Sequence, residues 1–212
     1  MLKIFIAFDE KDQSLGRFFL KCKEDFLFVL TMLQNFENVV YEIPSDRCHK
    51  AYVDIQIKPL SEESFLFITY THGNESGVIA TNEVFVKVEE DNSSFKNTFF
   101  YATSCLAGLN LGPDLIKNGC RAFIGYDQTI DKLIGEREPM SIKCDNAGIN
   151  AFLSQEVTAF QAYEQMKAVY NQEIHRLLQF GDILTASVLI NSREALIFLG
   201  DKELKKEDLV EN

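Results

Sequence analysis

Continuous apolar runs recur along this chain and limit the folds open to it. They occupy residues 2–8, 65–70, 98–102 and 122–126. Runs of this length without polar alternation are typical of strands buried on both faces of a parallel sheet. Residues 17–34 and 47–57 instead carry apolar side chains at helical spacing. Strands that alternate with helices predict an α/β fold, with a mostly parallel central sheet and helices on both faces.

The remaining segments are predicted with different degrees of detail. Residues 38–43 are expected to form a strand, and residues 76–90, broken at 81–83, a hairpin away from the main sheet. A helix is expected to begin near Pro113 and to end at Gly119.

The second half of the chain is less uniform. Residues 150–179 are predicted as two helices, because Thr158 and Gln161 have the spacing of a capping box. For residues 183–199 the pattern leaves open a helix, two strands or one of each. We expect a single domain over residues 1–201, followed by a charged, flexible tail over residues 202–212.

Composition excludes several classes of partner. The chain has 212 residues and a formal net charge of -11, which argues against binding to nucleic acid or to an anionic membrane. No apolar segment is long enough for a signal peptide or a membrane span. The 5 cysteines are odd in number and form no CxxC pair. We therefore expect no disulfide framework, no metal site and no cofactor, and a cytoplasmic location.

Two of the predicted buried strands are each followed by a reactive side chain. His72 and Gly73 follow residues 65–70, and Cys105 follows residues 98–102. Carboxyl ends of parallel strands meet at one edge of a sheet, so in neighbouring strands these groups would face each other across about 5–10 Å. His72 could then act as acid and base for the Cys105 thiol. The N–H groups of Gly73 and Cys105 could form an oxyanion hole.

This order of strand, His-Gly, hairpin, strand and Cys resembles the caspase-like peptidases, a group that includes caspases, metacaspases, gingipains, clostripain, separase and bacterial CHAT domains. The resemblance extends to the segment Gly-Cys-Arg-Ala-Phe-Ile-Gly at residues 119–125 and covers roughly residues 1–170. It implies a cysteine endopeptidase with His72 and Cys105 as a catalytic dyad, which requires no carboxylate partner. Bacterial CHAT-like or stand-alone caspase-like enzymes are the nearest subgroup, and a regulated effector in stress or defence is the role suggested by analogy.

The sequence departs from the family at positions that set specificity. Many basic-specific members carry an acidic residue at the position of Thr103, and caspases have Gln-Ala-Cys where this chain has Thr-Ser-Cys. No preference for the residue before the cleaved bond can therefore be carried over. We consider Asp9, Thr103 and Asp127 as possible pocket residues, with residues 127–146 as a mobile polar loop that walls the pocket. The partners expected are a protein or peptide substrate and an activating ligand or protein.

Two other functions remain open at the level of the sequence. One is a catalytically silent caspase-like module that acts as an adaptor or sensor. The other is a small-molecule binding domain of flavodoxin-like type, in which Cys105 and the loop from Gly108 to Gly112 cradle a ligand. Thiol-specific labelling and ligand-dependent thermal stabilisation separate these functions from a peptidase.

Overall fold

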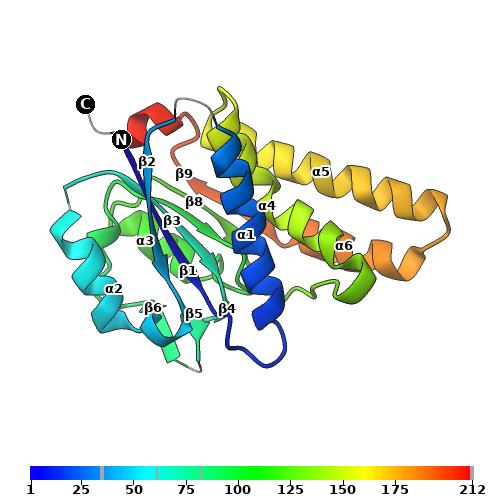
Figure 1. Ribbon diagram of the computed structural model, residues 1–212, viewed down its shortest axis with the longest axis horizontal. Helices are drawn as coiled ribbons and strands as arrows, with labels where there is room; N and C mark the ends of the chain where they lie inside the picture. Colours follow the sequence, from blue (N-terminus) through cyan, green and yellow to red (C-terminus); the bar gives the residue numbers. More distant parts are fainter. Residues whose placement is uncertain (34–35, 61, 82, 211–212) are drawn as a thin grey trace.

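The computed structural model describes residues 1–33, 36–60, 62–81 and 83–210 and contains a six-stranded central sheet (Figure 1). Its order is β2-β1-β3-β7-β8-β9. The first five strands are parallel, and β9 runs antiparallel to β8. The strands are β1 (Leu2–Phe8), β2 (Asn38–Ile43), β3 (Phe65–Tyr70), β7 (Phe99–Ala102), β8 (Ala122–Tyr126) and β9 (Leu196–Gly200). This confirms the predicted mostly parallel α/β sheet.

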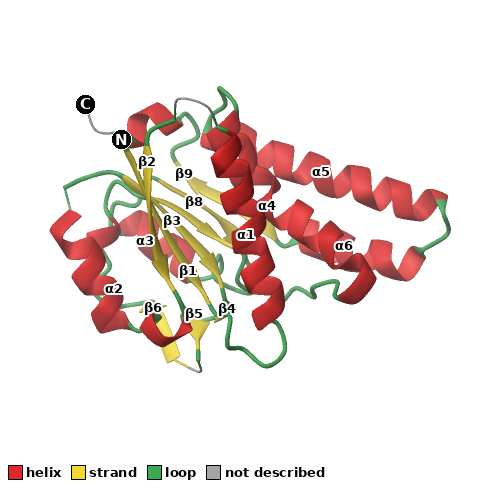
Figure 2. Cartoon of the chain, in the orientation of Figure 1, coloured by secondary structure: helices red, strands yellow, loops and turns green. Residues whose placement is uncertain are grey.

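Helices cover both faces of this sheet (Figure 2). One face carries the helices α1 (Gly16–Met32), α4 (Glu138–Ser154), α5 (Ala159–Gln179) and α6 (Ile183–Glu194). The other carries the shorter helices α2 (Lys50–Ile57) and α3 (Leu111–Lys117). The layered arrangement leaves the strand ends exposed as the place where a site can form.

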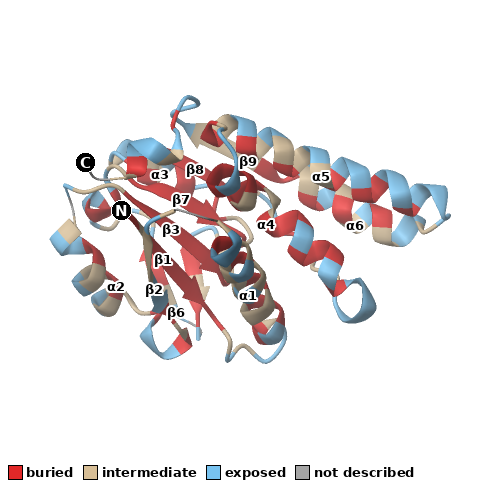
Figure 3. Ribbon diagram, turned by 45° about the horizontal axis from the view of Figure 1, so that its top comes forward, coloured by how far each residue is buried: buried red, intermediate tan, exposed pale blue. Residues whose placement is uncertain are grey.

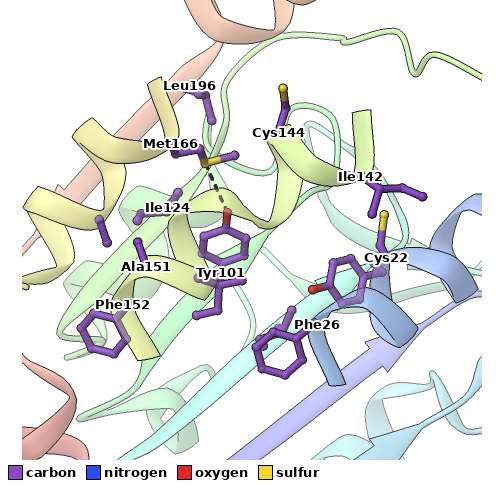
Figure 4. Close-up of a cluster of buried hydrophobic side chains, with 14 of the residues drawn as sticks. Cys22, Phe26, Tyr101, Ile124, Ile142, Cys144, Ala151, Phe152, Met166 and Leu196 are labelled. Atoms are coloured by element: carbon purple, nitrogen blue, oxygen red, sulfur yellow. Dashed lines mark hydrogen bonds between the residues drawn. The ribbon is translucent and has the colours of Figure 1, made fainter. Parts of the chain in front are cut away.

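Side chains along the buried strands point alternately to the two faces of the sheet and form a hydrophobic core on each face. In β1, Ile4 and Ile6 face α1 and α4, whereas Phe5 and Ala7 face α2. Figure 3 shows the resulting band of buried residues through the sheet. Figure 4 shows the first core, in which the Tyr101 hydroxyl lies 3.2 Å from the Met166 sulfur. A sheet buried on both faces explains why these strands read as unbroken apolar runs.

The predicted hairpin lies in a second sheet of three strands, β4-β5-β6. These strands are β4 (His72–Asn74), β5 (Gly77–Ala80) and β6 (Glu83–Lys87), and both pairings are antiparallel. The hairpin therefore follows directly from the strand that carries His72, and it stands at the carboxyl edge of the central sheet (Figure 1).

Elements in the second half both match and correct the expectations. A capping box at Thr158 begins α5 as predicted. Residues 183–199 form one helix and most of one strand, which was one of three open alternatives. The expected loop at residues 127–146 is wrong in its second part, because α4 begins at Glu138 with Pro139 in its first turn.

The end of the described chain packs more closely than expected. Leu204 and Leu209 are fully buried in the first core, although both lie in the segment expected to be a flexible tail. The Ala159 N–H donates to the Leu204 carbonyl, and the Lys206 ammonium donates to the Leu153 carbonyl. The packed part of the chain therefore reaches Leu209.

Some expected features lie outside the described residues. These are the last residue of the predicted first helix, Gln34, the centre of the hairpin break, Asn82, and residues 211–212. In the part of the chain that is described, no helix combines the length and the apolar character needed to cross a membrane.

Candidate active site at the carboxyl edge of β3 and β7

The two segments with reactive side chains lie next to each other at one edge of the sheet. Strands β3 and β7 are direct parallel neighbours, with Thr69 in register with Ala102. The pairing continues past β7, because the Thr103 N–H donates to the Thr69 carbonyl at 3.1 Å. Backbone pairing therefore places the segment that carries His72 and Gly73 beside the segment that carries Cys105.

Gly73 contacts the backbone of the cysteine segment directly. A Cβ built on Gly73 would lie 2.3 Å from the carbonyl oxygen of Cys105 and 2.9 Å from Cβ of Ser104. Real Cβ atoms do not approach a backbone oxygen so closely, so this position requires a residue without a side chain. The close approach places the Gly73 backbone beside the candidate nucleophile.

A set of buried hydroxyl groups links the segment that carries His72 to the segment that carries Cys105. The Ser104 hydroxyl lies 3.3 Å from Oγ1 of Thr69 and 3.1 Å from Oγ1 of Thr71. Thr71 Oγ1 also donates to the carbonyl of His72 at 3.0 Å. All these hydroxyl groups are buried, so they are not available to a substrate. Their hydrogen bonds instead fix the backbone around His72 and Cys105.

His72 stands at the surface and has a carboxylate partner that the sequence did not reveal. Its side chain is 36% exposed, and its Nε2 lies 3.3 Å from Oδ1 of Asp12. The ring packs edge-on against Phe19, with 5.3 Å between ring centroids. These contacts hold one ring nitrogen toward Asp12 and fix the plane of the imidazole, leaving the other nitrogen for a second partner.

Asp12 is itself fixed and ionised. It lies in the loop between β1 and α1, where Oδ1 accepts hydrogen bonds from the Ser14 N–H, the Ser14 hydroxyl and the Leu15 N–H. Burial acts against ionisation, but the hydrogen bonds from Leu15, Ser14 and His72 outweigh it and lower the pKa of Asp12 to about 2. The carboxylate is therefore charged at any pH at which His72 could work as a base.

Cys105 differs from the other four cysteines in exposure. It is partly exposed, whereas Cys22, Cys48, Cys120 and Cys144 are buried. Burial raises the pKa of each of these four thiols, that of Cys120 to about 12. Within the described residues, the hydrogen bonds of the Cys105 sulfur go to Ile130, whose carbonyl and N–H lie 3.5 and 3.4 Å away.

A cavity of about 400 Å³ opens beside His72, lined by Asp9, Lys11, Asp12, Gln13, His72 and Thr81. Asp9 is 2% exposed. Its carboxylate accepts hydrogen bonds from the Ser45 hydroxyl at 2.7 Å and from the Thr81 N–H at 2.8 Å. Asp9 therefore lies where the sequence suggested a pocket, with both oxygens already engaged.

The other two candidate pocket residues lie elsewhere. Thr103 is buried, and its hydroxyl donates to the Thr69 carbonyl at 3.1 Å. Asp127 follows β8, and its N–H donates to the Ala195 carbonyl. Its buried Oδ1 has no hydrogen-bond partner among the described residues. Neither residue is among the described residues that line the cavity beside His72.

The site can hold an acyl group and move protons, since a thiol, an imidazole and a carboxylate lie at one sheet edge. Across the described residues, no group of three or more His, Cys, Asp or Glu side chains is arranged to hold a metal ion.

Comparison with known proteins gives likenesses to solved structures. No family model matches the chain, and no curated protein sequence matches it. Among solved structures, an Arg-specific cysteine proteinase, gingipain R, superimposes with a TM-score of 0.58 at 12% sequence identity. The match covers 96% of this chain and 47% of the gingipain chain, so this chain spans about half the length of that protein. The chain has the caspase-like α/β fold of this proteinase.

Proposed function

We propose that this protein is a cysteine endopeptidase in which Cys105 is the nucleophile and His72 the acid and base. The observation that carries the proposal is the contact of Gly73 with the Cys105 backbone. This contact supports the proposal because His72 directly precedes Gly73 in the chain and Cys105 carries the thiol. The fold shared with a cysteine proteinase supports the same chemistry.

The reaction follows from the groups at this edge. His72 takes the thiol proton, and the Cys105 sulfur attacks the carbonyl carbon of the scissile bond. The N–H groups of Gly73 and Cys105 donate to the oxygen that becomes negative. His72 then gives the proton to the leaving amine. Water, deprotonated by His72, attacks the resulting thioester and releases the acid, and the sulfur leaves as thiolate.

Asp12 acts in this scheme as a positioning residue. It fixes the orientation of His72 through Nε2 and stabilises the imidazolium that forms when the thiol is deprotonated. The sequence resemblance alone supplied no carboxylate for this role. The low pKa of Asp12 keeps the charge in place throughout the cycle.

The cavity beside His72 favours a basic side chain of the substrate. It carries the carboxylates of Asp9 and Asp12, against the one cation of Lys11 among its described lining residues. The substrate we propose is a protein or peptide with Arg or Lys before the cleaved bond. We further propose a regulated cytoplasmic enzyme of the CHAT-like or stand-alone type, with an activating ligand or protein.

The test is cleavage of a mixed peptide library by the wild type and by Cys105→Ala, with and without cell lysate. Cys144→Ala is the matched control, because Cys144 is buried and far along the chain from the site. Cleavage that survives in the control and is lost in Cys105→Ala supports the proposal. No cleavage under any condition, together with no alkylation of Cys105, contradicts it.

One observation favours a second candidate, the catalytically silent module. The Cys105 sulfur is hydrogen-bonded to the backbone of Ile130, and the His72 Nε2 is directed at Asp12. A protein in this state could serve as an adaptor. Alkylation of Cys105 in the folded protein without any peptide cleavage is the result that would favour this function.

A further inference from the structure

The backbone of one segment lies directly over the cysteine. We call residues 128–132, which follow β8, the latch segment. The Gln128 carbonyl accepts from the Leu106 N–H at 3.2 Å. The Ile130 N–H donates a hydrogen bond to the Cys105 sulfur, and the Ile130 carbonyl accepts one from it. The Ile130 side chain is buried at 6% exposure. The sulfur is thus held by the latch segment.

Lys132 anchors the latch segment in the core. Its ammonium lies 2.5 Å from Oδ2 of Asp145, on helix α4, and the two side chains are only 5% and 1% exposed. The other oxygen of Asp145 accepts from the hydroxyls of Tyr126 at 2.7 Å and Tyr170 at 3.0 Å. Every charge in this cluster therefore has a partner inside the protein.

A buried ion pair of this kind is poorly explained by stability alone. Removing two charges from water costs several kcal/mol each, and an apolar pair is often as stable. A buried pair instead fixes one arrangement, because any other leaves a charge unpaired. Here the arrangement that is fixed places Ile130 on the Cys105 sulfur.

The chain immediately after Lys132 is built differently. Ile134 is 64% exposed, and Gly135 has a φ of +66° with no atom within 4 Å of a Cβ built on it. A cavity of about 470 Å³ lies between this stretch and α1, lined in part by Arg17 and Phe18. The latch segment is therefore followed, after Leu133, by an exposed glycine bend that borders this cavity.

We propose that the Lys132–Asp145 pair latches residues 128–132 over Cys105, so that the thiol is held in a resting state until this segment is released. The catalytic meaning of the latch rests on the proposed peptidase function, but its physical content is the accessibility of one thiol. Lys132 is thus a positioning residue that acts through Ile130. Alkylation of Cys105 and amide exchange measure the latch without any substrate cleavage, so its failure is distinguishable from failure of the peptidase proposal.

The first test compares the rate of Cys105 alkylation by iodoacetamide in the wild type and in Lys132→Met/Asp145→Asn. This double change replaces the ion pair with neutral groups of similar size and leaves an acceptor for the two tyrosine hydroxyls. Opening of the segment is expected to raise the alkylation rate by about tenfold or more. A folded double variant that reacts at the wild-type rate overturns the proposal.

The matched control is Lys143→Met/Glu173→Gln. It removes the ion pair between Lys143 on α4, which is 57% exposed, and Glu173 on α5, which also pairs with Arg176. Its alkylation rate is expected to equal that of the wild type. An increase as large as that of the Lys132 variant would mean that any lost ion pair loosens Cys105, which contradicts a specific latch.

The second test needs only the wild type and can overturn the latch proposal even if the double variant does not fold. Hydrogen exchange is followed at the Ile130 amide, with the Ile124 amide of β8 as an internal reference. A latched segment predicts clear protection at Ile130, since its N–H donates to the Cys105 sulfur. Exchange of Ile130 at the rate of an unstructured chain, with Ile124 protected, overturns the proposal.

Discussion

Gly73 and the carbonyl of Cys105 touch across the ends of two neighbouring strands. A Cβ at residue 73 would lie 2.3 Å from the Cys105 oxygen. The contact arises because β3 and β7 pair in parallel and both chains leave the sheet at the same edge. The spacing between them is thus fixed by the sheet itself, which makes residue 73 a sensitive place to test the site.

Gly73→Ala is expected to move the Cys105 backbone, because the added methyl group overlaps a main-chain oxygen and not a flexible side chain. We expect a loss of about 1–3 kcal/mol in the free energy of unfolding and a strong loss of peptide cleavage. Urea denaturation and a cleavage assay check this. Gly181→Ala is the control for cleavage: its φ of +73° makes a side chain strained although the space around it is open, so it should lose stability but keep cleavage. Equal loss of cleavage in the two variants would contradict the steric explanation.

The positions of His72 and Cys105 could be predicted from sequence for a physical reason. Unbroken apolar runs mark doubly buried strands, and parallel strands bring their following residues to one edge. Asp12 could not be found this way, because residues 9–15 show no periodicity and contact His72 only through the fold. The turn in which Asp12 accepts from the Ser14 and Leu15 N–H groups was a local signal, because Asp two residues before Ser favours such a turn.

Helix α4 was missed over residues 138–149, about three turns, because part of its buried face is polar. Asp145 and Asn146 are 1% and 0% exposed, and their partners come from strands far along the chain. The Tyr126 hydroxyl donates to Asp145, and the Tyr70 hydroxyl donates to Asn146 at 2.8 Å. A hydrophobic pattern cannot report a helix whose burial depends on such tertiary hydrogen bonds.

Native thiol labelling is expected to distinguish Cys105 from the other four cysteines. At pH 7 a maleimide should modify Cys105 alone in the folded protein and all 5 cysteines after denaturation, because burial shields the others and raises their pKa. Mass spectrometry of the peptides checks this. Labelling of Cys22 or Cys120 before Cys105 would contradict the burial pattern.

Ser104→Ala tests the hydroxyl set beneath the site. The change leaves Cβ of residue 104 in place but removes the partner of the buried hydroxyls of Thr69 and Thr71. We expect a loss of about 1–3 kcal/mol in the free energy of unfolding, measured by urea denaturation. Ser187→Ala, at an exposed position of α6, is the matched control and is expected to change stability little. A Ser104 variant as stable as this control would count against the network.

Asp12→Asn tests the charge of Asp12, both in its turn with Ser14 and Leu15 and in positioning His72. The pKa of Asp12 is about 2 in the folded protein against 3.8 as the ordinary value. A carboxyl with a lowered folded pKa stabilises the fold above its unfolded pKa, and this contribution is lost as the pH falls through the folded pKa. The wild type should therefore be more stable than Asp12→Asn at pH 6, by less than about 2 kcal/mol because solvent screens a partly exposed group.

The same difference in stability should shrink between pH 4 and pH 2 as Asp12 becomes protonated. Urea denaturation at several pH values checks this, and a difference that stays constant down to pH 2 would contradict a carboxylate effect. Peptide cleavage at neutral pH should fall about tenfold or more in Asp12→Asn, because His72 loses the charge that orients it. Asp91→Asn provides the control, since Asp91 makes a similar turn with Ser93 away from the site. Cleavage unaffected in both variants would mean that Asp12 only forms the turn before α1 and that His72 needs no carboxylate partner.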